Sequence, residues 1–393
     1  MNRAHYGFPD IGKRAHALSD QSLKTTKHSA IFDHIHAEIL SGKYKDGDRL
    51  PTEHELIKVF GTSRPTVSRA LRDLQTAGLI RRRAGSGSFV TLNNKDAQST
   101  KLFALLIPDL GQTEIFEPIC AQIARDVQGH GHGLLWGDFR EADPSTRREH
   151  AEELCRDYIE RKVSGVFFAP VEMTPGMAET NRRIVDALYA AGIAVVLLDR
   201  DVVDYPQRSV FDVVGIDNRR GAHLLTEHLV ECGCNRIAFF ARPLSAPTVA
   251  HRIAGWRDAL VEAGLDANDG LICSGAPDDT EFVRTAIKKA RPHAFVCAND
   301  LTAAKLMHTL DDLNVGVPDD VRVVGFDDVK YANLVRVPLT TIHQPCSDIG
   351  KVAAQTMLDR IANPELPARN ILIDPQLVIR KSCGANGKKE ARK

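Results

Sequence analysis

The chain has 393 residues, of which 43% are hydrophobic and 26% are charged, an ordinary balance for a globular protein of two or three domains. It has no run of about 18 uncharged apolar residues, and its first 24 residues are polar. The sequence therefore predicts neither a membrane span nor a secretory signal, and it indicates a cytoplasmic protein.

Eight cysteines lie scattered along the chain and are expected to be reduced thiols. One close pair, Cys232 and Cys234, has His228 upstream. A single C-x-C supplies too few ligands for a closed tetrahedral zinc site, so packing at a helix end is the preferred interpretation. We expect no metal and no other cofactor.

The net charge of zero conceals an asymmetry. Residues 24–95 carry 13 Lys and Arg against 7 Asp and Glu, whereas residues 96–393 carry 35 against 42. A basic N-terminal part suits a polyanionic partner.

Residues 1–26 lack a periodic apolar pattern and are expected to form a flexible arm. Over 27–40, isoleucines recur every four residues, which predicts an amphipathic helix. A second short helix is predicted to end at Phe60, because Thr52 and Glu55 have the spacing of a capping box at its start.

A third helix is predicted after Ser63, with Pro65 in its first turn, where helical N–H groups have no intrahelical partner. Its apolar residues share one face, and Ser68, Arg69 and Arg72 point away from it.

Two short runs, 79–83 and 88–90, are separated by the turn 84–87 and predict a hairpin. The order of three helices and a wing indicates a winged helix-turn-helix over 27–91, followed by a polar linker at 92–101. In such a motif the second helix of the pair enters the major groove and presents its N-terminal residues to base edges. Arg64 can bind a guanine edge with two hydrogen bonds.

Four segments closely resemble the winged helix-turn-helix of the GntR family: Asp48–Glu53, Thr62–Leu71, Gly78–Ile80 and Gly85–Val90. The resemblance implies that Arg49, Arg64, Thr66 and the wing glycines contact DNA. Ser68 and His54 stand where members of the family often carry arginine, which leaves the operator sequence open. The predicted DNA-binding residues are Arg49, Arg64, Pro65, Thr66, Ser68, Arg69, Arg72, Gly85 and Gly87.

Beyond the linker, apolar strand-like runs alternate with helical stretches, which is typical of parallel α/β sheets. About nine strands are many for one sheet, so residues 102–382 are predicted to form two α/β lobes, followed by a basic tail at 383–393. The predicted strands are 102–107, 133–136, 165–169, 194–198, 213–216, 237–240, 271–273, 294–298 and 321–326.

Ligands of α/β sheets collect at the carboxyl ends of strands. Polar residues follow several of the strand-like runs, including 339–343, and they are Asp109, Asp199, Arg200, Asn299, Asp300, Asp327, Asp328 and Gln344. They suit a sugar, whose hydroxyls donate and accept hydrogen bonds.

Some of these polar and aromatic residues have a structural interpretation as well. Phe116, Trp136 and Phe326 are candidates for the flat faces of a sugar site, although Trp136 is better explained as core. Asp217, Asp300 and Asp328 also fit helix caps, and a cap is preferred for Asp300.

Four further segments resemble the effector domain of LacI-family repressors, which is similar to periplasmic sugar-binding proteins: His251–Trp256, Cys297–Asp300, Val324–Asp328 and Pro338–Ile342. The resemblance implies three crossings between the lobes, near residues 211, 344 and 373. It also implies a ligand crevice lined by Asp199, Arg252, Asn299, Asp327 and Gln344, with Asp109 and Phe116 as further candidates.

A GntR-type reader joined to a LacI-type sensor resembles the bacterial arabinose-repressor group. This combination predicts a ligand-responsive transcription regulator, a repressor, that binds double-stranded operator DNA as a homodimer. Its effector is expected to be a small polar molecule, a carbohydrate, and related pockets accept pentoses, hexoses, nucleobases and sugar phosphates. The sequence does not distinguish an inducer from a corepressor.

The sequence disfavours two rival classes of function. An enzyme is disfavoured, because the sequence contains no nucleophile elbow, P-loop, H-E-x-x-H or dinucleotide-binding glycine motif, and the adjacent Asp327 and Asp328 side chains should diverge. No catalytic residue is predicted. A transport-type binding protein shares the two-lobed architecture but requires export and has no use for a DNA-binding module.

Overall fold

The computed structural model describes residues 27–40, 42–76, 79–83, 87–91, 100–108, 114–137 and 146–385. The predicted arm and most of the predicted linker lie outside these residues. The chain forms two compact units, one running to Leu102 and one beginning at Phe103. Residues 127–136 include a strand of a sheet in the second unit and are described there.

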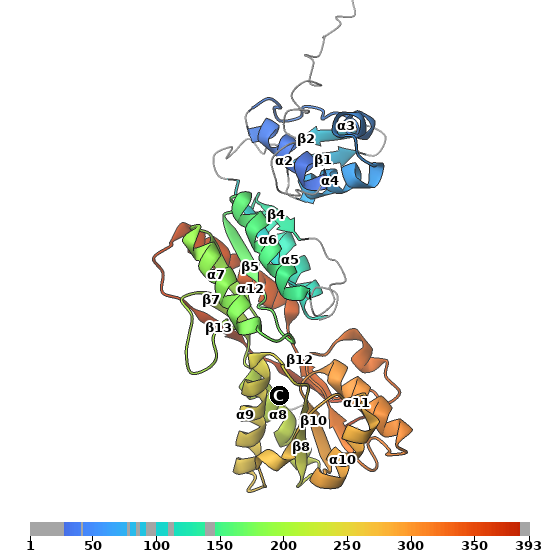
Figure 1. Ribbon diagram of the computed structural model, residues 1–393. Helices are drawn as coiled ribbons and strands as arrows, with labels where there is room; N and C mark the ends of the chain where they lie inside the picture. The colour runs from blue at the N-terminus through green and yellow to red at the C-terminus, as the bar shows by residue number, and fades with distance from the viewer. Residues whose placement is uncertain are drawn as a thin grey trace, which may run out of the picture. The chain divides into compact units, whose positions relative to one another are not determined.

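Within the residues that the structure describes, the N-terminal unit has three helices and a hairpin (Figure 1). Its elements are α2 (Lys27–Leu40), α3 (Glu53–Phe60), α4 (Arg64–Thr76), β1 (Ile80–Arg83) and β2 (Gly87–Val90). The hairpin is antiparallel, with Ile80 opposite Val90. The core is formed by the predicted apolar stripes, including Ile31, Ile35, Ile39, Val67, Leu71 and Leu74.

The start of α3 has the predicted capping box. Thr52 Oγ1 accepts the N–H of Glu55 at 3.3 Å, and Glu55 Oε2 accepts the N–H of Thr52 at 2.7 Å. Both donors would otherwise lack partners at the helix start, so this local pattern fixes where α3 begins.

The first lobe of the C-terminal unit is built on a six-stranded sheet in the order β13-β7-β6-β5-β3-β4. Helices α6 and α7 pack together, and α12 packs against β5, β6 and β7. The strands are β3 (Leu102–Leu106), β4 (Gly133–Trp136), β5 (Gly165–Phe168), β6 (Ala194–Leu198), β7 (Asp212–Ile216) and β13 (Asn370–Ile373). The helices are α5 (Phe116–Gly129), α6 (Arg147–Glu160), α7 (Met177–Ala190) and α12 (Cys346–Ala362).

The second lobe has a parallel sheet in the order β11-β10-β8-β9, with α8 and α9 on one side and α10 and α11 on the other (Figure 1). A small antiparallel pair, β12 and β14, lies beside it. The strands are β8 (Ile237–Ala241), β9 (Ile272–Ser274), β10 (Ala294–Cys297), β11 (Arg322–Val324), β12 (Thr341–His343) and β14 (Gln376–Val378). The helices are α8 (Asn218–Glu231), α9 (Pro247–Glu262), α10 (Thr280–Ala290), α11 (Asp300–Asp312), η2 (Asp269–Leu271) and η3 (Lys330–Asn333).

The chain passes between the lobes after β7, after β12 and after β13. The predicted crossings near 344 and 373 match the last two. The one predicted near 211 is wrong, because β7 belongs to the first lobe and the crossing follows it at Asp217. Buried Asp212 holds β7 in that lobe: its carboxylate accepts hydrogen bonds from Arg360 at 3.0 Å and from Arg369 at 3.2 Å.

The predicted α/β class is confirmed, and each predicted strand overlaps an observed one. The strands β13 and β14 were not predicted. None of the described helices combines the length and the apolar character that crossing a membrane requires.

Candidate nucleic-acid interface and ligand pocket

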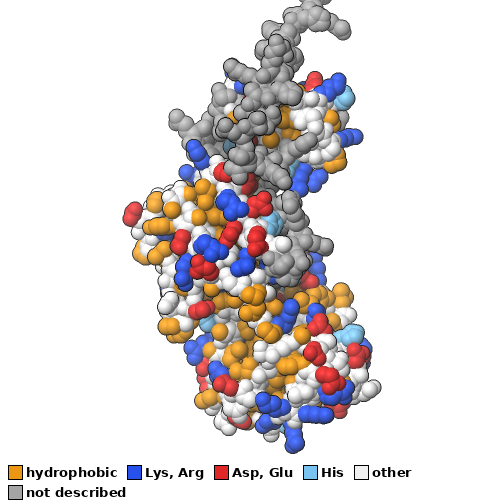
Figure 2. Space-filling model, in the orientation of Figure 1, with side chains coloured by type: hydrophobic (Ala, Val, Ile, Leu, Met, Phe, Trp, Pro, Cys, Tyr) orange, Lys and Arg blue, Asp and Glu red, His pale blue; other side chains and the backbone are white. Residues whose placement is uncertain are grey.

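Helix α4 presents its polar face to solvent and its apolar face to the core of the N-terminal unit. Arg64, Pro65 and Arg72 are exposed, whereas Thr66, Ser68 and Arg69 are half-buried. Thr66 shares a hydrogen bond of 2.9 Å with Ser63, which orders the first turn of the helix. Figure 2 shows Lys and Arg side chains along the edge of this unit.

Glu53 joins the predicted reading helix to the wing. Arg64 Nε donates to Glu53 Oε2 at 3.1 Å, and Arg82 Nη2 of β1 donates to Glu53 Oε1 at 2.5 Å. The Arg64 side chain remains 80% exposed. An exposed ion pair contributes about 0–1 kcal/mol, so a phosphate or a base edge can displace this carboxylate. Sequence reasoning missed Glu53, because its partners are distant in the sequence.

The wing leaves room for Arg49. The Arg49 backbone forms a bridge with Phe89, and its guanidinium lies against Gly87, where a Cβ would approach Arg49 Nε to 3.0 Å. Gly87 also has a φ of +112°, which side chains of L-residues rarely adopt. Gly87 therefore has a steric role beside Arg49, and the predicted Gly85 lies outside the described residues.

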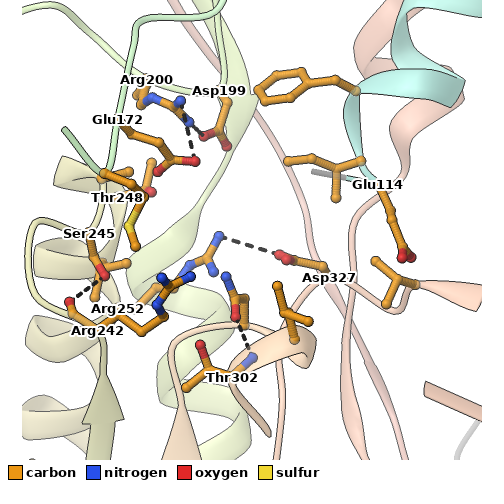
Figure 3. A pocket seen from close by; sticks show the side chains of 18 of the residues that line it. Glu114, Glu172, Asp199, Arg200, Arg242, Ser245, Thr248, Arg252, Thr302 and Asp327 are labelled. Atoms are coloured by element: carbon orange, nitrogen blue, oxygen red, sulfur yellow. Dashed lines mark hydrogen bonds and ion pairs between the residues drawn. The ribbon is translucent and has the colours of Figure 1, made fainter. Parts of the chain in front are cut away.

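The C-terminal unit contains a pocket of about 220 Å³ between its two lobes (Figure 3). It opens at the carboxyl ends of strands from both sheets, where ligand sites of α/β proteins form. From the first lobe it is lined by Glu114, Ile115, Phe116, Arg147, Glu172, Met173, Asp199 and Arg200. From the second it is lined by Arg242, Ser245, Ala246, Thr248, Val249, Arg252, Asn299, Leu301, Thr302, Asp327, Val329 and Tyr331.

Arg252 is the most firmly held of the predicted pocket residues. It projects from α9 and is buried. Its Nε donates to Asn218 Oδ1 at 2.8 Å, and its Nη1 donates to the carbonyl of Ala298. The guanidinium also lies 3.7 Å from the centroid of the Phe326 ring, a stacked arrangement that fixes its plane.

Asp327 lies beside Arg252 in the lining of the second lobe, with Arg252 Nη2 at 3.6 Å from Asp327 Oδ1 (Figure 3). Gln344 Nε2 donates to the same oxygen at 2.7 Å. Burial raises the pKa of Asp327 to about 7, although Arg252 and Gln344 oppose this effect. Its φ of 114° is unusual for a residue with a side chain, and such strain is commonly retained where function requires it.

Asp199 provides an unsatisfied acceptor. Its Oδ2 accepts Arg200 Nη1 at 2.8 Å, but its Oδ1 has no hydrogen-bond partner within the described part of the chain, and the side chain is only 6% exposed. Arg200 also lies 3.6 Å from Glu172 and donates to the carbonyl of Pro170. A buried oxygen without a partner costs free energy, so Asp199 Oδ1 is suited to a ligand that donates a hydrogen bond.

Phe116 and Asn299 also line the pocket, each with a structural task. The Arg200 guanidinium carbon lies 5.8 Å from the centroid of the Phe116 ring. Asn299 Oδ1 accepts the N–H of Thr302 at 2.8 Å and is the cap of α11. The preferred cap interpretation of Asp300 is therefore wrong, since this buried carboxylate instead accepts Thr341 Oγ1 at 2.6 Å and the N–H of Val329 at 3.0 Å.

Of the other two candidate helix caps, one is confirmed and one is wrong. Asp217 caps α8 by accepting the N–H of Arg220 at 2.9 Å. Asp328 is no cap, since η3 follows Val329, and its carboxylate binds Arg380 at 2.6 Å and His343 at 3.0 Å.

Gln344 and Asp109 stand apart from the other predicted pocket residues. Gln344 is buried and is not among the lining residues, so it acts on the pocket by holding Asp327. Asp109 lies outside the described residues. Trp136 is not among the lining residues either, and Phe326 lies behind Arg252.

Sequence reasoning missed several lining residues, among them Glu172, Arg242 and Arg147. Glu172 and Arg242 follow β5 and β8, so an inspection carried further past those strands would have found them. Arg147 begins α6, and its Nη1 donates to the carbonyl of Glu172 at 3.3 Å, a placement with no local signal.

Cys232 lies at the carboxyl end of α8, as the packing interpretation expects. Its Sγ is 3.7 Å from His228 Nε2, while Cys234 Sγ accepts Arg322 Nη1 at 2.9 Å. All eight cysteines are free thiols.

Two family models match the chain. The model of the bacterial regulatory proteins of the gntR family matches residues 27–90, and that of the periplasmic binding protein-like domain matches residues 226–383. An arabinose metabolism transcriptional repressor of Geobacillus stearothermophilus is 28% identical over 367 residues, which cover 91% of this chain and 97% of that repressor. The transcriptional repressor PurR of Vibrio parahaemolyticus is 33% identical over 239 residues, which cover 58% of this chain and 68% of PurR.

Solved structures show the same fold. The transcriptional regulator CelR in complex with cellobiose has a TM-score of 0.62 and 23% identity, and the match covers 85% of this chain and all of that one. A LacI-family regulator of Enterococcus faecium with bound ribose has a TM-score of 0.58 and 22% identity, with 72% of this chain and 98% of that one covered. This chain therefore belongs to the bacterial transcriptional repressors that join a GntR-type winged helix-turn-helix to a LacI-type, periplasmic-binding-protein-like effector domain.

Proposed function

We propose that this repressor acts in the cytoplasm, binds operator DNA as a homodimer, and is controlled by a carbohydrate bound in the pocket between its lobes. Residues 27–91 act as the DNA reader, residues 102–382 act as the sensor, and the pocket binds its ligand without transforming it. The predicted set from Arg49 to Gly87 supplies the DNA contacts, with Arg64 on a base edge and Arg72 on a phosphate.

The pocket is the observation that carries this proposal. Asp199, Arg252, Asn299 and Asp327 converge on it, each able to form two hydrogen bonds, and Phe116 adds an apolar face. Its volume of about 220 Å³ lies below the roughly 300–1,000 Å³ that is typical of pockets for drug-sized ligands. A molecule of about monosaccharide size with several hydroxyls fits both the volume and the lining.

Because the lining comes from both lobes, a bound effector bridges them. The loops that follow β5 and β8 already touch, since the N–H of Met173 donates to the carbonyl of Leu244 at 3.1 Å. A ligand that contacts Asp199 and Arg252 together favours the closed arrangement by the difference between its affinities for the two arrangements. A typical coupling of about 1–3 kcal/mol changes operator affinity roughly 5- to 150-fold.

The homodimer follows from the size and charge of the reader. A single small basic reader binds weakly and mainly through phosphates, and two readers on half-sites about one helical turn apart provide both affinity and specificity. If ligand binding rotates the lobes, the reader spacing no longer matches the operator. Release of DNA on effector binding is the expected sign.

A mobility-shift titration of the promoter region next to the gene tests this function. We expect a complex with two protein chains per operator, weaker at higher salt, and released by one member of a panel of pentoses and hexoses. Sedimentation of the free protein at micromolar concentration should give a dimer. A monomer with full operator affinity, or an operator complex indifferent to every carbohydrate, would contradict the proposal.

A further inference from the structure

The charges that line the pocket are divided unequally between the lobes. The first lobe contributes three carboxylates and two guanidinium groups: Glu114, Glu172, Asp199, Arg147 and Arg200. The second lobe contributes two guanidinium groups and one carboxylate: Arg242, Arg252 and Asp327. The lining from the first lobe is thus acidic and the lining from the second lobe is basic, and a bound molecule contacts both.

Arg242 is responsible for the basic side. It comes directly after β8, at the carboxyl end of the strand, and extends toward the pocket from the second lobe (Figure 3). Unlike Arg252, it forms no salt bridge with any residue that the structure describes. Asp278, an acidic residue near it, is already bound to Lys305 Nζ at 2.9 Å. Arg242 is exposed and lines the pocket, so among the described residues it is a pocket cation without a fixed counterion.

The first turn of α9 adds to the same side of the pocket. Its N-cap is Ala246, which has no side-chain acceptor, and its second residue, Thr248, is buried and lines the pocket with Ser245 and Val249. Pro247 has no N–H and the N–H of Val249 donates to the carbonyl of Ala246, so this turn offers the N–H of Thr248, and the positive end of the helix dipole attracts anions. Ser245 Oγ donates to the carbonyl of Arg242 at 2.7 Å, which joins the arginine to this turn.

The first-lobe side of the pocket has an acceptor that is suited to a hydrogen-bond donor of the ligand. Asp199 Oδ1 is buried without a partner among the described residues, as shown above, so a ligand hydroxyl is the group that completes it. A ligand that satisfies both sides presents hydroxyls to the first lobe and an anionic group to the second.

We propose that the effector is a polyhydroxylated acid, a sugar carboxylate or sugar phosphate, whose hydroxyls donate to Asp199 and whose anionic group lies against Arg242 and the first turn of α9. This inference rests on the proposed function and names the chemical class of its effector. A guanidinium binds either anion through two parallel hydrogen bonds, which a neutral hydroxyl does not reproduce.

Binding is tested with the full-length protein by calorimetry on matched compounds. The panel pairs D-glucose with D-gluconate, D-glucuronate and D-glucose 6-phosphate, and pairs D-ribose and L-arabinose with their aldonates and 5-phosphates. We expect at least one acid to bind about tenfold or more tightly than its neutral parent, as one charge-assisted hydrogen bond implies. The compound that binds most tightly shows whether the anionic group of the effector is a carboxylate or a phosphate.

The variant Arg242→Gln should remove most of that preference for the acid. Arg208→Gln, the same change in an exposed loop of the first lobe, should retain it. The inference is overturned if neutral parents bind as tightly as their acids, if no acid binds, or if Arg242→Gln retains the preference. If a neutral sugar binds and causes the protein to release the operator, the proposed function stands and only this inference fails. If no carbohydrate binds, both the inference and the proposed function fail.

Discussion

Arg64 of the reader and Arg252 of the pocket are held in opposite ways. In the reader, Arg64 is 80% exposed and has one carboxylate partner, Glu53, which it shares with Arg82. In the pocket, Arg252 is 5% exposed and is held by Asn218, the carbonyl of Ala298, Asp327 and the face of Phe326.

The difference is one of desolvation. An exposed guanidinium exchanges its partner for a phosphate or a base at little cost, and salt screens it. A buried guanidinium has already lost its water, so removing it leaves several partners unsatisfied at once. Arg64 is therefore placed for reversible exchange and Arg252 for fixed geometry, and four substitutions separate these behaviours.

The largest effect is expected from Arg252→Ala. The variant loses the charge-assisted hydrogen bonds to the effector, each worth roughly 1.5–3 kcal/mol, so effector affinity should fall about 100-fold or more. Operator affinity should change little in the absence of effector. Calorimetry and mobility shift measure the two quantities, with Arg257→Ala on the exposed side of α9 as the control. An unchanged dissociation constant for the effector would remove Arg252 from the pocket.

Arg64→Ala should affect only the reader. Loss of a two-bond contact with guanine costs about 1–3 kcal/mol of operator affinity and relaxes specificity at that base pair. Arg72→Ala is the matched comparison, because loss of a phosphate contact should weaken all sequences alike and reduce the salt slope by about one. Titration of operator variants at several salt concentrations separates the two. Equal losses on all sequences for both variants would place Arg64 on the backbone.

Asp327→Asn tests the buried side through pH. The pKa of this carboxyl is about 7 in the folded protein, above the value of about 3.9 in an unfolded chain, so the native state retains its proton more strongly. Its contribution to stability is complete below pH of about 4 and is lost as pH rises through about 7. Between pH 5 and 8, the unfolding free energy of the wild type should fall by roughly 1–3 kcal/mol more than that of the asparagine variant.

Denaturant titrations at both pH values measure that decline, with the exposed Asp311→Asn as control. Buried Asp300, whose pKa is also raised well above its usual value by burial and by Asp327, keeps a residual slope in both proteins. An identical slope in wild type and Asp327→Asn would show that Asp327 is ionised throughout.

The smallest effect is expected from Glu53→Gln. Freeing Arg64 and Arg82 from the carboxylate should raise operator affinity a few-fold at low salt, while stability changes by less than about 1 kcal/mol. Glu365→Gln removes an exposed charge far along the sequence and serves as control. A large loss of stability would show that Glu53 supports the reader rather than restrains its cations.

Local patterns explain what the sequence could predict. The capping box at Thr52 lies within four residues, and most strands are continuous apolar runs bounded by turns, so both are readable without a fold. The strands β13 and β14 were missed because they are short and half-exposed, with patterns that resemble loops. Sheet membership was also not readable, since β7 is equally apolar in either lobe.

The pocket shows the same limit. Residues just beyond strand ends, such as Asp199 after β6 and Asp327 three residues after β11, were found by the rule of strand ends. Arg147 lies at the start of a helix, and the partners of Glu53 are distant in the sequence, so no spacing in the sequence predicts the role of either residue. Asn299 and Asp300 are neighbours, and the cap was predicted for the wrong one. Asn299 caps α11, whereas the buried carboxylate of Asp300 accepts a hydrogen bond from Thr341.

We expect effector binding across the lobes to control DNA binding. Small-angle scattering of the full-length protein, recorded along an effector titration that also reports operator affinity, tests it directly. We expect lobe separation to fall and operator affinity to change roughly 5- to 150-fold at the same effector concentration. A change in operator affinity with no change in lobe separation would contradict it.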